Sequence, residues 1–315
     1  MIKPSEKFGG FFFEEGMNPL NFLKDPFGFG TRKISRIKAP FEIRQNLNEL
    51  TVLVTGGSKG IGSSLVDKLT SRGLQIICVS RSKPNASNAV THLQLDLSDP
   101  KDLKTLVSDC PKIDGVVFNA GAMPKEKPTK CNQINIDCLY LLHVLGPAWL
   151  TRQLIRLNKF SKQSRVILVT SGGALPTPLN IEYMGKLKEP YNRIQQYAFH
   201  KRHQIHLVEY LAQTYTKSSC NFYSMHPGWV ATPGLLEGMP SFYNFTKSML
   251  REPADGADTI DWLMCSDNQE SGKLYFDRHE VPTNPLPWVP RRPKQIMQFI
   301  HKLERQLDEL DSLLC

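Results

Sequence analysis

Short apolar segments alternate with helical segments over most of the chain, and this alternation limits the fold more than any other feature. The expected strands are 51–55, 74–80, 91–95, 115–118, 165–170, 221–225 and 274–276. The expected helices are 60–71, 99–109, 132–158, 193–217 and 253–265. Strands that are apolar on both faces and alternate with helices indicate a parallel sheet covered on both sides. Because crossovers are right-handed, the predicted class is α/β with a Rossmann-type, doubly wound parallel sheet in a single domain.

The sequence divides into three parts around this pattern. Residues 1–50 carry several phenylalanines among glycines and prolines, which predicts an N-terminal arm. Residues 51–280 hold the alternating elements and form the predicted nucleotide-binding domain. Residues 281–315 form a C-terminal extension whose helix places its apolar residues on one stripe. That helix either packs back on its own domain or contacts a second subunit or partner, which leaves a homo-oligomer open.

Charge and cysteine content exclude several classes of protein. The net charge is +9, but no run of five like charges occurs, so a solvated surface is favoured over nucleic-acid binding. The 7 cysteines are scattered without a CxxC pair, which argues against a disulfide framework or a bound metal. No segment has the roughly 20 apolar residues that span a bilayer. We expect an intracellular, cytoplasmic protein, with a mitochondrial location, peripheral membrane attachment or a complex as alternatives.

A glycine-rich turn follows the first expected strand. It comprises Thr55, Gly56, Gly57, Ser58, Lys59, Gly60, Ile61 and Gly62. Glycines let the backbone turn tightly against a pyrophosphate, while the next helix points its N-terminal amides at the phosphates. Glycine-rich turns also occur in plain loops, but the strand–turn–helix context favours a dinucleotide site.

The Thr-Gly-x-x-x-Gly-x-Gly spacing resembles the classical short-chain dehydrogenase/reductase family. Further motifs follow in that family's order over roughly residues 51–280, and they are Asp96-Leu97, Asn119-Ala120-Gly121, Ser171, Tyr197-x-x-x-Lys201, and Pro227-Gly228-Trp229-Val230 with Thr232 beyond. The segments around Ser171 and Pro227 resemble a poorly characterised branch, the member-twelve dehydrogenases/reductases. The resemblance implies nicotinamide cofactor contacts by Thr55, Gly56, Ser58, Lys59, Gly60, Ile61, Gly62, Arg81, Asp96, Leu97, Asn119, Ala120, Gly121, Tyr197, Lys201, Pro227, Gly228, Val230 and Thr232.

The end of the second expected strand bears on the choice of nicotinamide cofactor. NAD-binding members of the fold place an acidic residue there, which bonds the ribose 2′-hydroxyl. This chain has Ser80-Arg81-Ser82-Lys83 instead. A carboxylate would repel a 2′-phosphate, whereas Arg81 can bind it and Lys59 adds charge. NADP(H) is therefore the predicted cofactor, with a solvated loop arginine as the alternative reading of Arg81.

Tyr197 and Lys201 form the predicted chemical centre. Hydride transfer to a carbonyl requires a proton donor at the oxygen, and a nearby ammonium lowers a phenol pKa. The two residues are four apart on an expected helix and so share a face. The resemblance implies that Tyr197 is the acid/base, that Lys201 holds the nicotinamide ribose and lowers the tyrosine pKa, and that Ser171 binds the substrate oxygen.

Asn135 is the candidate fourth member of the catalytic set. It lies early in the expected helix 132–158, and the resemblance implies that it supports a water linked to Lys201. Cys138 stands where relatives carry glycine, so a capping or surface asparagine remains the alternative.

The expected substrate pocket draws on two further segments. Ser171 and Tyr197 are 26 residues apart, more than in many relatives, which predicts an inserted loop over 174–192 with Tyr183 as a pocket residue or a plain surface tyrosine. Segment 233–250 contributes Leu235, Leu236, Met239, Phe242, Tyr243 and Phe245, which indicate an apolar substrate. His200, His203 and His206 share helical spacing, but no acid or cysteine accompanies them as a zinc site requires.

The sequence thus predicts an NADP(H)-dependent oxidoreductase that interconverts a carbonyl and an alcohol on a small apolar substrate. The alternative is a catalytically silent nucleotide-binding subunit or sensor that keeps the fold alone.

Overall fold

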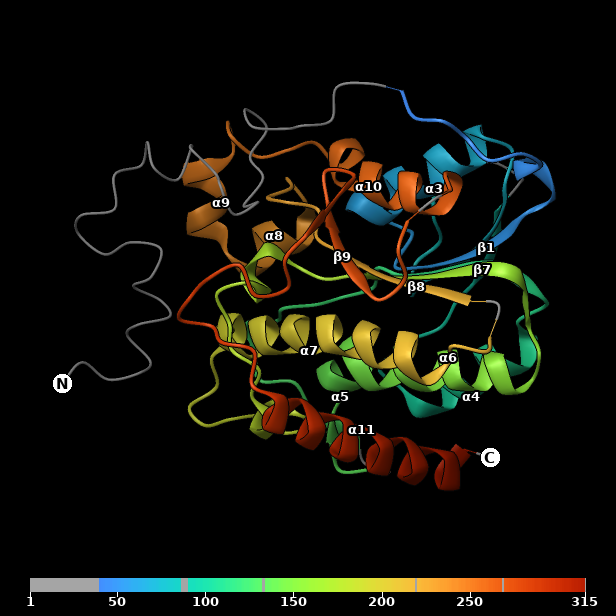
Figure 1. The fold of residues 1–315 in the computed structure, drawn as a ribbon. Helices are drawn as coiled ribbons and strands as arrows, with labels where there is room; N and C mark the ends of the chain where they lie inside the picture. Colours follow the sequence, from blue (N-terminus) through green and yellow to red (C-terminus); the bar gives the residue numbers. More distant parts are fainter. Residues whose placement is uncertain (1–39, 86–89, 132–133, 219, 268, 315) are drawn as a thin grey trace.

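A sheet of eight strands forms the centre of the molecule in the computed structural model, which describes residues 40–315 except 86–89, 132–133, 219, 268 and 315 (Figure 1). The strand order is β10-β9-β8-β7-β4-β1-β2-β3. The strands are β1 (Thr51–Thr55), β2 (Gln75–Val79), β3 (Val90–Leu93), β4 (Ile113–Phe118), β7 (Phe160–Val169), β8 (Cys220–Met225), β9 (Lys273–Phe276) and β10 (His279–Val281). All neighbours pair in parallel except β10, which is antiparallel to β9. The predicted doubly wound α/β class is confirmed, and most of residues 1–50 lie outside the described part.

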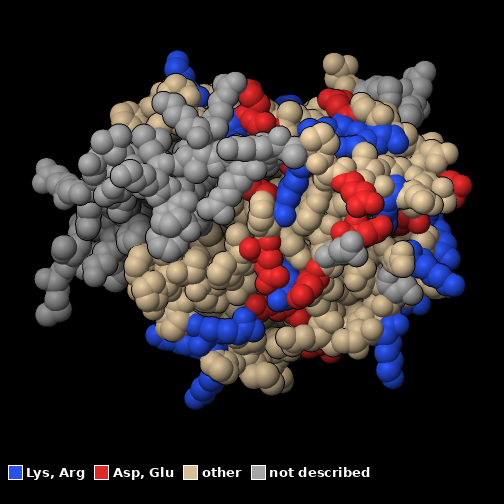
Figure 2. All heavy atoms as spheres, turned by 45° about the horizontal axis from the view of Figure 1, so that its top comes forward, with Lys and Arg blue, Asp and Glu red and all other residues tan. Residues whose placement is uncertain are grey.

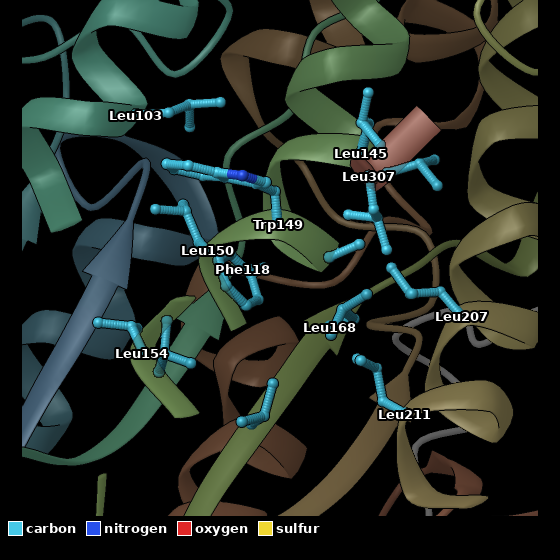
Figure 3. Packing of buried hydrophobic residues seen from close by; sticks show 14 of the residues in the cluster. Leu103, Phe118, Leu145, Trp149, Leu150, Leu154, Leu168, Leu207, Leu211 and Leu307 are labelled. Carbon is cyan, nitrogen blue, oxygen red and sulfur yellow. The ribbon is translucent and has the colours of Figure 1, made fainter. Parts of the chain in front are cut away.

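Helices cover both faces of the sheet (Figure 1). One face carries α3 (Gly60–Ser71) and α10 (Pro253–Cys265). The other carries α4 (Pro100–Asp109), α6 (Gly146–Arg156), α7 (Arg193–Thr214) and α11 (Pro293–Leu314). Figure 3 shows leucines and Trp149 from these four helices meeting the strand residues Phe118 and Leu168. The shorter elements are η2 (Leu47–Glu49), η4 (Gly172–Ala174), η5 (Ile181–Tyr183), α8 (Pro233–Gly238) and α9 (Pro240–Thr246).

The C-terminal helix α11 packs back on its own domain. Its buried stripe of Phe299, Leu303, Leu307, Leu310 and Leu314 belongs to the same core cluster as α4, α6 and α7. The Trp149 indole also donates to Asp311 Oδ1 at 2.7 Å, which ties α6 to α11. Of the two readings of this helix, the structure therefore supports packing within the chain.

The single helix expected over 132–158 begins later than predicted, at Cys138, and residues 134–137 are not helical. A hairpin of β5 (Lys130–Cys131) and β6 (Ile136–Asp137) precedes α5 (Cys138–Tyr140), the π-helical turn η3 (Leu141–Leu145) and α6. Asp137 starts the helical part because its Oδ1 accepts from Leu139 N at 2.9 Å. An aspartate before an apolar run is a helix-start signal that the sequence does offer.

Pro147 changes the hydrogen bonding of the helical run without breaking it. Proline lacks the N–H that would bond the carbonyl four residues earlier, here that of His143. The His143 carbonyl instead accepts from Gln204 Nε2 of α7 at 2.7 Å, so its bonding is satisfied from another helix. Gly146 N–H bonds to Leu141 O, five residues back, which is the π-helical pattern. The turn therefore fixes His143 against α7.

Among the residues that the structure describes, we find no helix of the length and apolar character that crossing a bilayer requires.

Candidate active site

A large cleft lies beyond the carboxyl ends of the parallel strands, where ligands bind in doubly wound sheets. Its volume is about 1380 Å³. Most of the predicted site residues line it together, namely Gly56, Ser58, Lys59, Gly60, Ile61, Arg81, Asp96, Leu97, Asn119, Ala120, Gly121, Ser171, Tyr197, Lys201, Pro227, Gly228, Val230 and Thr232. The fold thus gathers the ends of β1, β2, β3, β4, β7 and β8 around one space.

Thr55 and Gly62 lie outside the lining of this cleft and shape the glycine turn from beneath. Thr55 Oγ1 accepts from Asn119 N at 3.1 Å and Ala120 N at 3.0 Å, so it joins the ends of β1 and β4. A Cβ on Gly62 would lie 2.1 Å from Gly56 O. No side chain fits at that distance, so α3 can approach the turn this closely only with glycine.

The turn itself has the form that a nucleotide phosphate needs. Gly56 has a φ of 67° and Gly60 a φ of 56°, both in the left-handed region that glycine adopts without strain. A Cβ on Gly56 would lie 2.8 Å from Ala120 Cα. The turn lines the cleft and leads into the N-terminus of α3, and the residues present fit a dinucleotide.

Arg81 stands at the cleft just after β2. Its side chain is 77% exposed, and NH1 lies 3.9 Å from Asp96 Oδ2. Asp96 is oriented by Ser98, which donates to its Oδ1 from the backbone at 3.0 Å and from the hydroxyl at 2.6 Å. The Arg81 guanidinium is thus free to turn toward an anion in the cleft, and no carboxylate occupies 80–83.

Tyr197 and Lys201 face the cleft from α7. Lys201 Nζ lies 5.3 Å from the centre of the Tyr197 ring and donates to Val169 O at 2.8 Å. Burial lowers the pKa of Lys201 to about 7, because desolvation penalises its ammonium form. Burial also raises the pKa of Tyr197 above its ordinary value. This is opposite to the expected lowering, because burial desolvates the phenolate form.

Ser171 begins the segment after β7 and also lines the cleft. Its Oγ accepts from Gly173 N at 3.2 Å and so caps the short helix η4. The hydroxyl proton remains available for donation, because a serine hydroxyl accepts and donates at once. The side chain is therefore oriented by its own loop and can offer a proton to a ligand.

The prediction that Asn135 lies early in a helix is wrong. Asn135 occupies the exposed turn between β5 and β6 with a φ of 48°, and Lys130 Nζ donates to its Oδ1 at 2.9 Å. His143 of η3 borders the lysine instead. A Cβ on Gly121 would lie 3.3 Å from His143 Nε2 and 3.7 Å from Lys201 Nζ. In the sequence, His143 is only a histidine within an apolar helical run, and this pattern by itself does not predict that it belongs to the site.

The outer part of the cleft is lined by segments from far apart in the chain. They contribute Pro176, Thr177 and Pro178 from the expected insert, Leu235, Leu236 and Met239 around α8, and Trp288 and Val289 after β10. Lys125, Glu126, Lys127 and Glu237 also line it. The walls are mainly apolar with charged residues among them. No pattern in the sequence predicted that Trp288 and Val289 line the cleft.

The four aromatic residues that we considered for this pocket, Tyr183, Phe242, Tyr243 and Phe245, all lie outside its lining. Tyr183 stacks on Phe199, with ring centres 3.9 Å apart, and donates to Gln195 Oε1 at 3.0 Å. It does not line the cleft, and it is half-buried against α7. Phe242 packs beneath Trp229 at 4.5 Å, and Phe245 is 71% exposed outside the cleft.

His200, His203 and His206 are buried on the side of α7 away from solvent. Within residues 40–314, leaving out the undescribed 86–89, 132–133, 219 and 268, no group of three His, Cys, Asp or Glu side chains is arranged to hold a metal ion. Figure 2 shows the face that carries α3 and α10, where acidic and basic side chains intermingle over the coloured part. This is the pattern of a solvated surface.

Comparison with known proteins agrees with this architecture. A family model described as short chain dehydrogenase matches residues 50–237, more than half of the chain. The human protein Dehydrogenase/reductase SDR family member 12 is 32% identical over 286 residues, covering 84% of this chain and 89% of its own. Mouse Retinol dehydrogenase 14 is 25% identical over 266 residues, covering 73% of this chain and 78% of its own.

Solved structures show the same fold at lower identity. A short chain dehydrogenase family protein from Francisella tularensis superposes with a TM-score of 0.56 at 19% identity, covering 71% of this chain and 95% of its own. A 3-ketoacyl-(acyl-carrier-protein) reductase from Brucella melitensis, solved with NADH, superposes with a TM-score of 0.52 at 21% identity, covering 70% of this chain and 92% of its own. Because the family model spans most of the nucleotide-binding core and the described motifs meet in one cleft, the chain belongs to the short-chain dehydrogenase/reductase family.

Proposed function

We propose that the protein is an NADP(H)-dependent oxidoreductase that interconverts a carbonyl and an alcohol on an apolar substrate, with Tyr197 as acid/base. The observation that carries this proposal is that Tyr197, Lys201 and Ser171 share one cleft with the glycine turn. The glycine turn, Asn119 and the loop after β8 would hold the dinucleotide. When bound, its nicotinamide would supply or accept the hydride.

The chain's own residues then handle the proton and the substrate oxygen. Tyr197 donates a proton to the oxygen of the carbonyl during reduction and takes it back during oxidation. Lys201 binds the ribose and offsets the charge of a tyrosinate, and the Ser171 hydroxyl donates to the substrate oxygen. Acid/base help of this kind is typically worth roughly 10²–10⁴ in rate.

The preference for NADP(H) rests on Arg81 and Lys59. Both line the cleft, and no acidic residue follows β2 where a ribose 2′-hydroxyl would be bound. An arginine fork suits a phosphate through charge-assisted hydrogen bonds. Structural relatives have been solved with NADH and with NADPH, so the choice is argued from this chain's residues.

The apolar substrate class rests on the outer wall of the cleft. Leu235, Leu236, Met239, Trp288 and Val289 meet there, and such a lining excludes water from an apolar ligand. The similarity to a protein named Retinol dehydrogenase 14 makes retinoids a reasonable part of the test panel.

The test is NADPH oxidation by the purified protein with a panel of aldehydes, ketones, retinoids and steroids. We expect turnover with at least one apolar carbonyl compound, faster with NADPH than with NADH. Tyr197→Phe should lower kcat by roughly 10²–10⁴ with little change in the Kd for NADPH. Tyr183→Phe is the matched control, because Tyr183 lies outside the cleft, and it should retain activity.

Two outcomes would overturn the proposal. Equal rates for the wild type and Tyr197→Phe would remove the tyrosine from the chemistry. Tight NADPH binding without turnover of any compound in either direction would favour the silent nucleotide-binding subunit.

A further inference from the structure

Three fully buried side chains form a row behind the Tyr197–Lys201 pair. Asp137, His200 and His143 come from β6, α7 and η3, and each is 0% exposed. Asp137 Oδ2 lies 3.5 Å from His200 Nε2, and His200 Nδ1 lies 3.2 Å from His143 Nδ1. His143 Nε2 in turn lies 3.0 Å from Ala122 N, at the loop that lines the cleft. The row therefore links the interior to the cofactor side of the site.

The backbone fixes the proton positions at the outer end of this row. Ala122 N–H can only donate, so His143 Nε2 must be the unprotonated, accepting nitrogen. The proton of the neutral His143 ring then sits on Nδ1 and is donated to His200 Nδ1. Because that His200 nitrogen accepts, the proton of His200 sits on Nε2 and faces Asp137.

The inner end does not fix the tautomers by itself, because Gln196 Nε2 contacts three groups there. Gln196 Nε2 lies 3.1 Å from Lys186 O, 3.3 Å from Asp137 Oδ2 and 3.0 Å from His200 Nε2. It has two hydrogens, and the carbonyl and the carboxylate can only accept them. When these two groups take both hydrogens, His200 Nε2 carries its own proton, and its 3.0 Å contact with Gln196 Nε2 then joins two donors. The assignment of one tautomer to each histidine therefore rests on the Ala122 N–H at the outer end of the row.

Several titratable groups surround the row. His143 faces Lys201 and the Tyr197 ring, whose centre lies 5.6 Å from the centre of the His143 ring. His200 faces Tyr140 and His203, with ring centres 5.6 Å and 6.4 Å from its own. Burial lowers the pKa of both His143 and His200 well below the usual value, and the charge of Lys201 lowers both further. Burial raises the pKa of Asp137 to about 6. Near neutral pH the row is therefore a carboxylate followed by two neutral imidazoles.

We propose that Asp137 and His200 are positioning residues that hold His143 in the tautomer whose unprotonated Nε2 anchors Gly121–Ala122 beside Lys201. In this tautomer, no N–H of His143 points at the lysine ammonium, and the Gly121–Ala122 wall of the cofactor cleft keeps its hydrogen bond. The inference rests on the proposed function for its kinetic part only, because the tautomers can be measured without turnover.

Asp137→Asn tests the proposal with minimal change in shape. The amide oxygen can still accept from Leu139 N, but its NH₂ would face the Nε2–H of His200, and two donors cannot bond. The two donors can be separated by a change of tautomer. The His200 proton then moves to Nδ1, and the His143 proton moves to Nε2, where it faces Ala122 N–H and Lys201. A tautomer reversed by loss of such a carboxylate is known to impair catalysis severely while the geometry stays intact.

The direct readout is long-range ¹⁵N–¹H NMR of the full-length protein labelled with ¹⁵N-histidine, with His143→Gln and His200→Gln used for assignment. We expect His143 protonated at Nδ1 and His200 at Nε2 in the wild type. Asp137→Asn should reverse both, and the control His203→Gln should reverse neither, since His203 bonds Asn180 O outside the row. A wild-type His143 that is charged or protonated at Nε2 would overturn the proposal, even if the asparagine variant fails to fold.

The kinetic readout is the pH profile of kcat/KM for NADPH-dependent reduction. Asp137→Asn should move the alkaline limb to lower pH and reduce kcat/KM near neutral pH by roughly 10-fold, the effect of one hydrogen bond. His203→Gln should leave the position of the limb unchanged. An unshifted limb in Asp137→Asn, or an equal shift in both variants, contradicts the proposed link to Lys201. Absence of turnover in the wild type would count against the proposed function, while the NMR result would still decide the tautomers.

Discussion

Lys201 Nζ lies 5.3 Å from the centre of the Tyr197 ring while it donates to Val169 O at 2.8 Å. The lysine is therefore held by strand β7 as well as by its own helix. Its position does not depend on the tyrosine, and its ammonium is paired with a neutral carbonyl rather than a carboxylate. This is why burial dominates its titration.

The pH dependence of the reaction should follow Lys201. Its pKa of about 7 in the free protein means that the ammonium is lost as the pH rises through that value. We expect kcat/KM for carbonyl reduction to fall above about pH 7, because kcat/KM reports the free enzyme. A profile that stays flat to about pH 9 would contradict a buried, lowered lysine.

Lys201→Met should stabilise the fold, although it removes the reaction. The unfolded chain keeps the ordinary lysine pKa of 10.5, so between pH 7 and 10.5 it binds more protons than the folded chain. The free energy of unfolding of the wild type therefore rises with pH between pH 7 and 10.5. The amount by which Lys201→Met exceeds the wild type in this free energy is largest below pH 7. Urea unfolding at about pH 6 and about pH 9 measures the difference, which should shrink at the higher pH.

Gly62→Ala should abolish tight nucleotide binding. The new Cβ would lie 2.1 Å from Gly56 O, so the turn must shift, at a cost of about 1–3 kcal/mol. Titration of NADPH fluorescence should show binding weakened by at least about 10-fold. Gly234→Ala is the control, because a Cβ there meets nothing within 4 Å although Gly234 lines the same cleft. Equal affinities for the two variants would remove the turn from the binding site.

Arg81→Asp should shift the preference from NADPH toward NADH. The variant replaces a guanidinium at the cleft by a carboxylate that repels a 2′-phosphate and accepts from a 2′-hydroxyl. We expect the NADPH-to-NADH affinity ratio to fall by roughly 10- to 100-fold. Lys83→Asp makes the same charge change two residues away, outside the cleft lining, and should have a much smaller effect. Similar ratios in both variants would place the preference elsewhere.

Asp311→Ala should loosen the C-terminal helix α11. Asp311 accepts from the Trp149 indole at 2.7 Å, from Arg156 NH1 at 3.0 Å and from Gln153, so its loss leaves a buried indole N–H unpaired. The expected loss of unfolding free energy is about 1–3 kcal/mol. Asp308→Ala removes an exposed ion pair with Arg152 and should cost under about 1 kcal/mol. Thermal melts of the two variants that coincide would contradict the role of Asp311.

The sequence by itself determined the strands, the glycine turn and the face shared by Tyr197 and Lys201. These depend on neighbours within a few positions: strand periodicity, the conformations open to glycine, and a separation of four on a helix. The structure places β1, α3 and α10 at the bounds expected from sequence, and it gathers motifs from six strand ends because parallel strands end at one edge.

Only the tertiary structure decided that Asn135 turns outward and that His143 stands beside Lys201. The position of His143 depends on Pro147, on the cap by Asp137 and on the hydrogen bond from Gln204 of a different helix. No local sequence pattern predicts that Gln204 contacts this turn. The row of Asp137, His200 and His143 likewise joins residues of β6, α7 and η3. Burial and hydrogen bonds between such distant residues form only when the helices dock on the sheet, because the chain must bury these polar groups together or not at all.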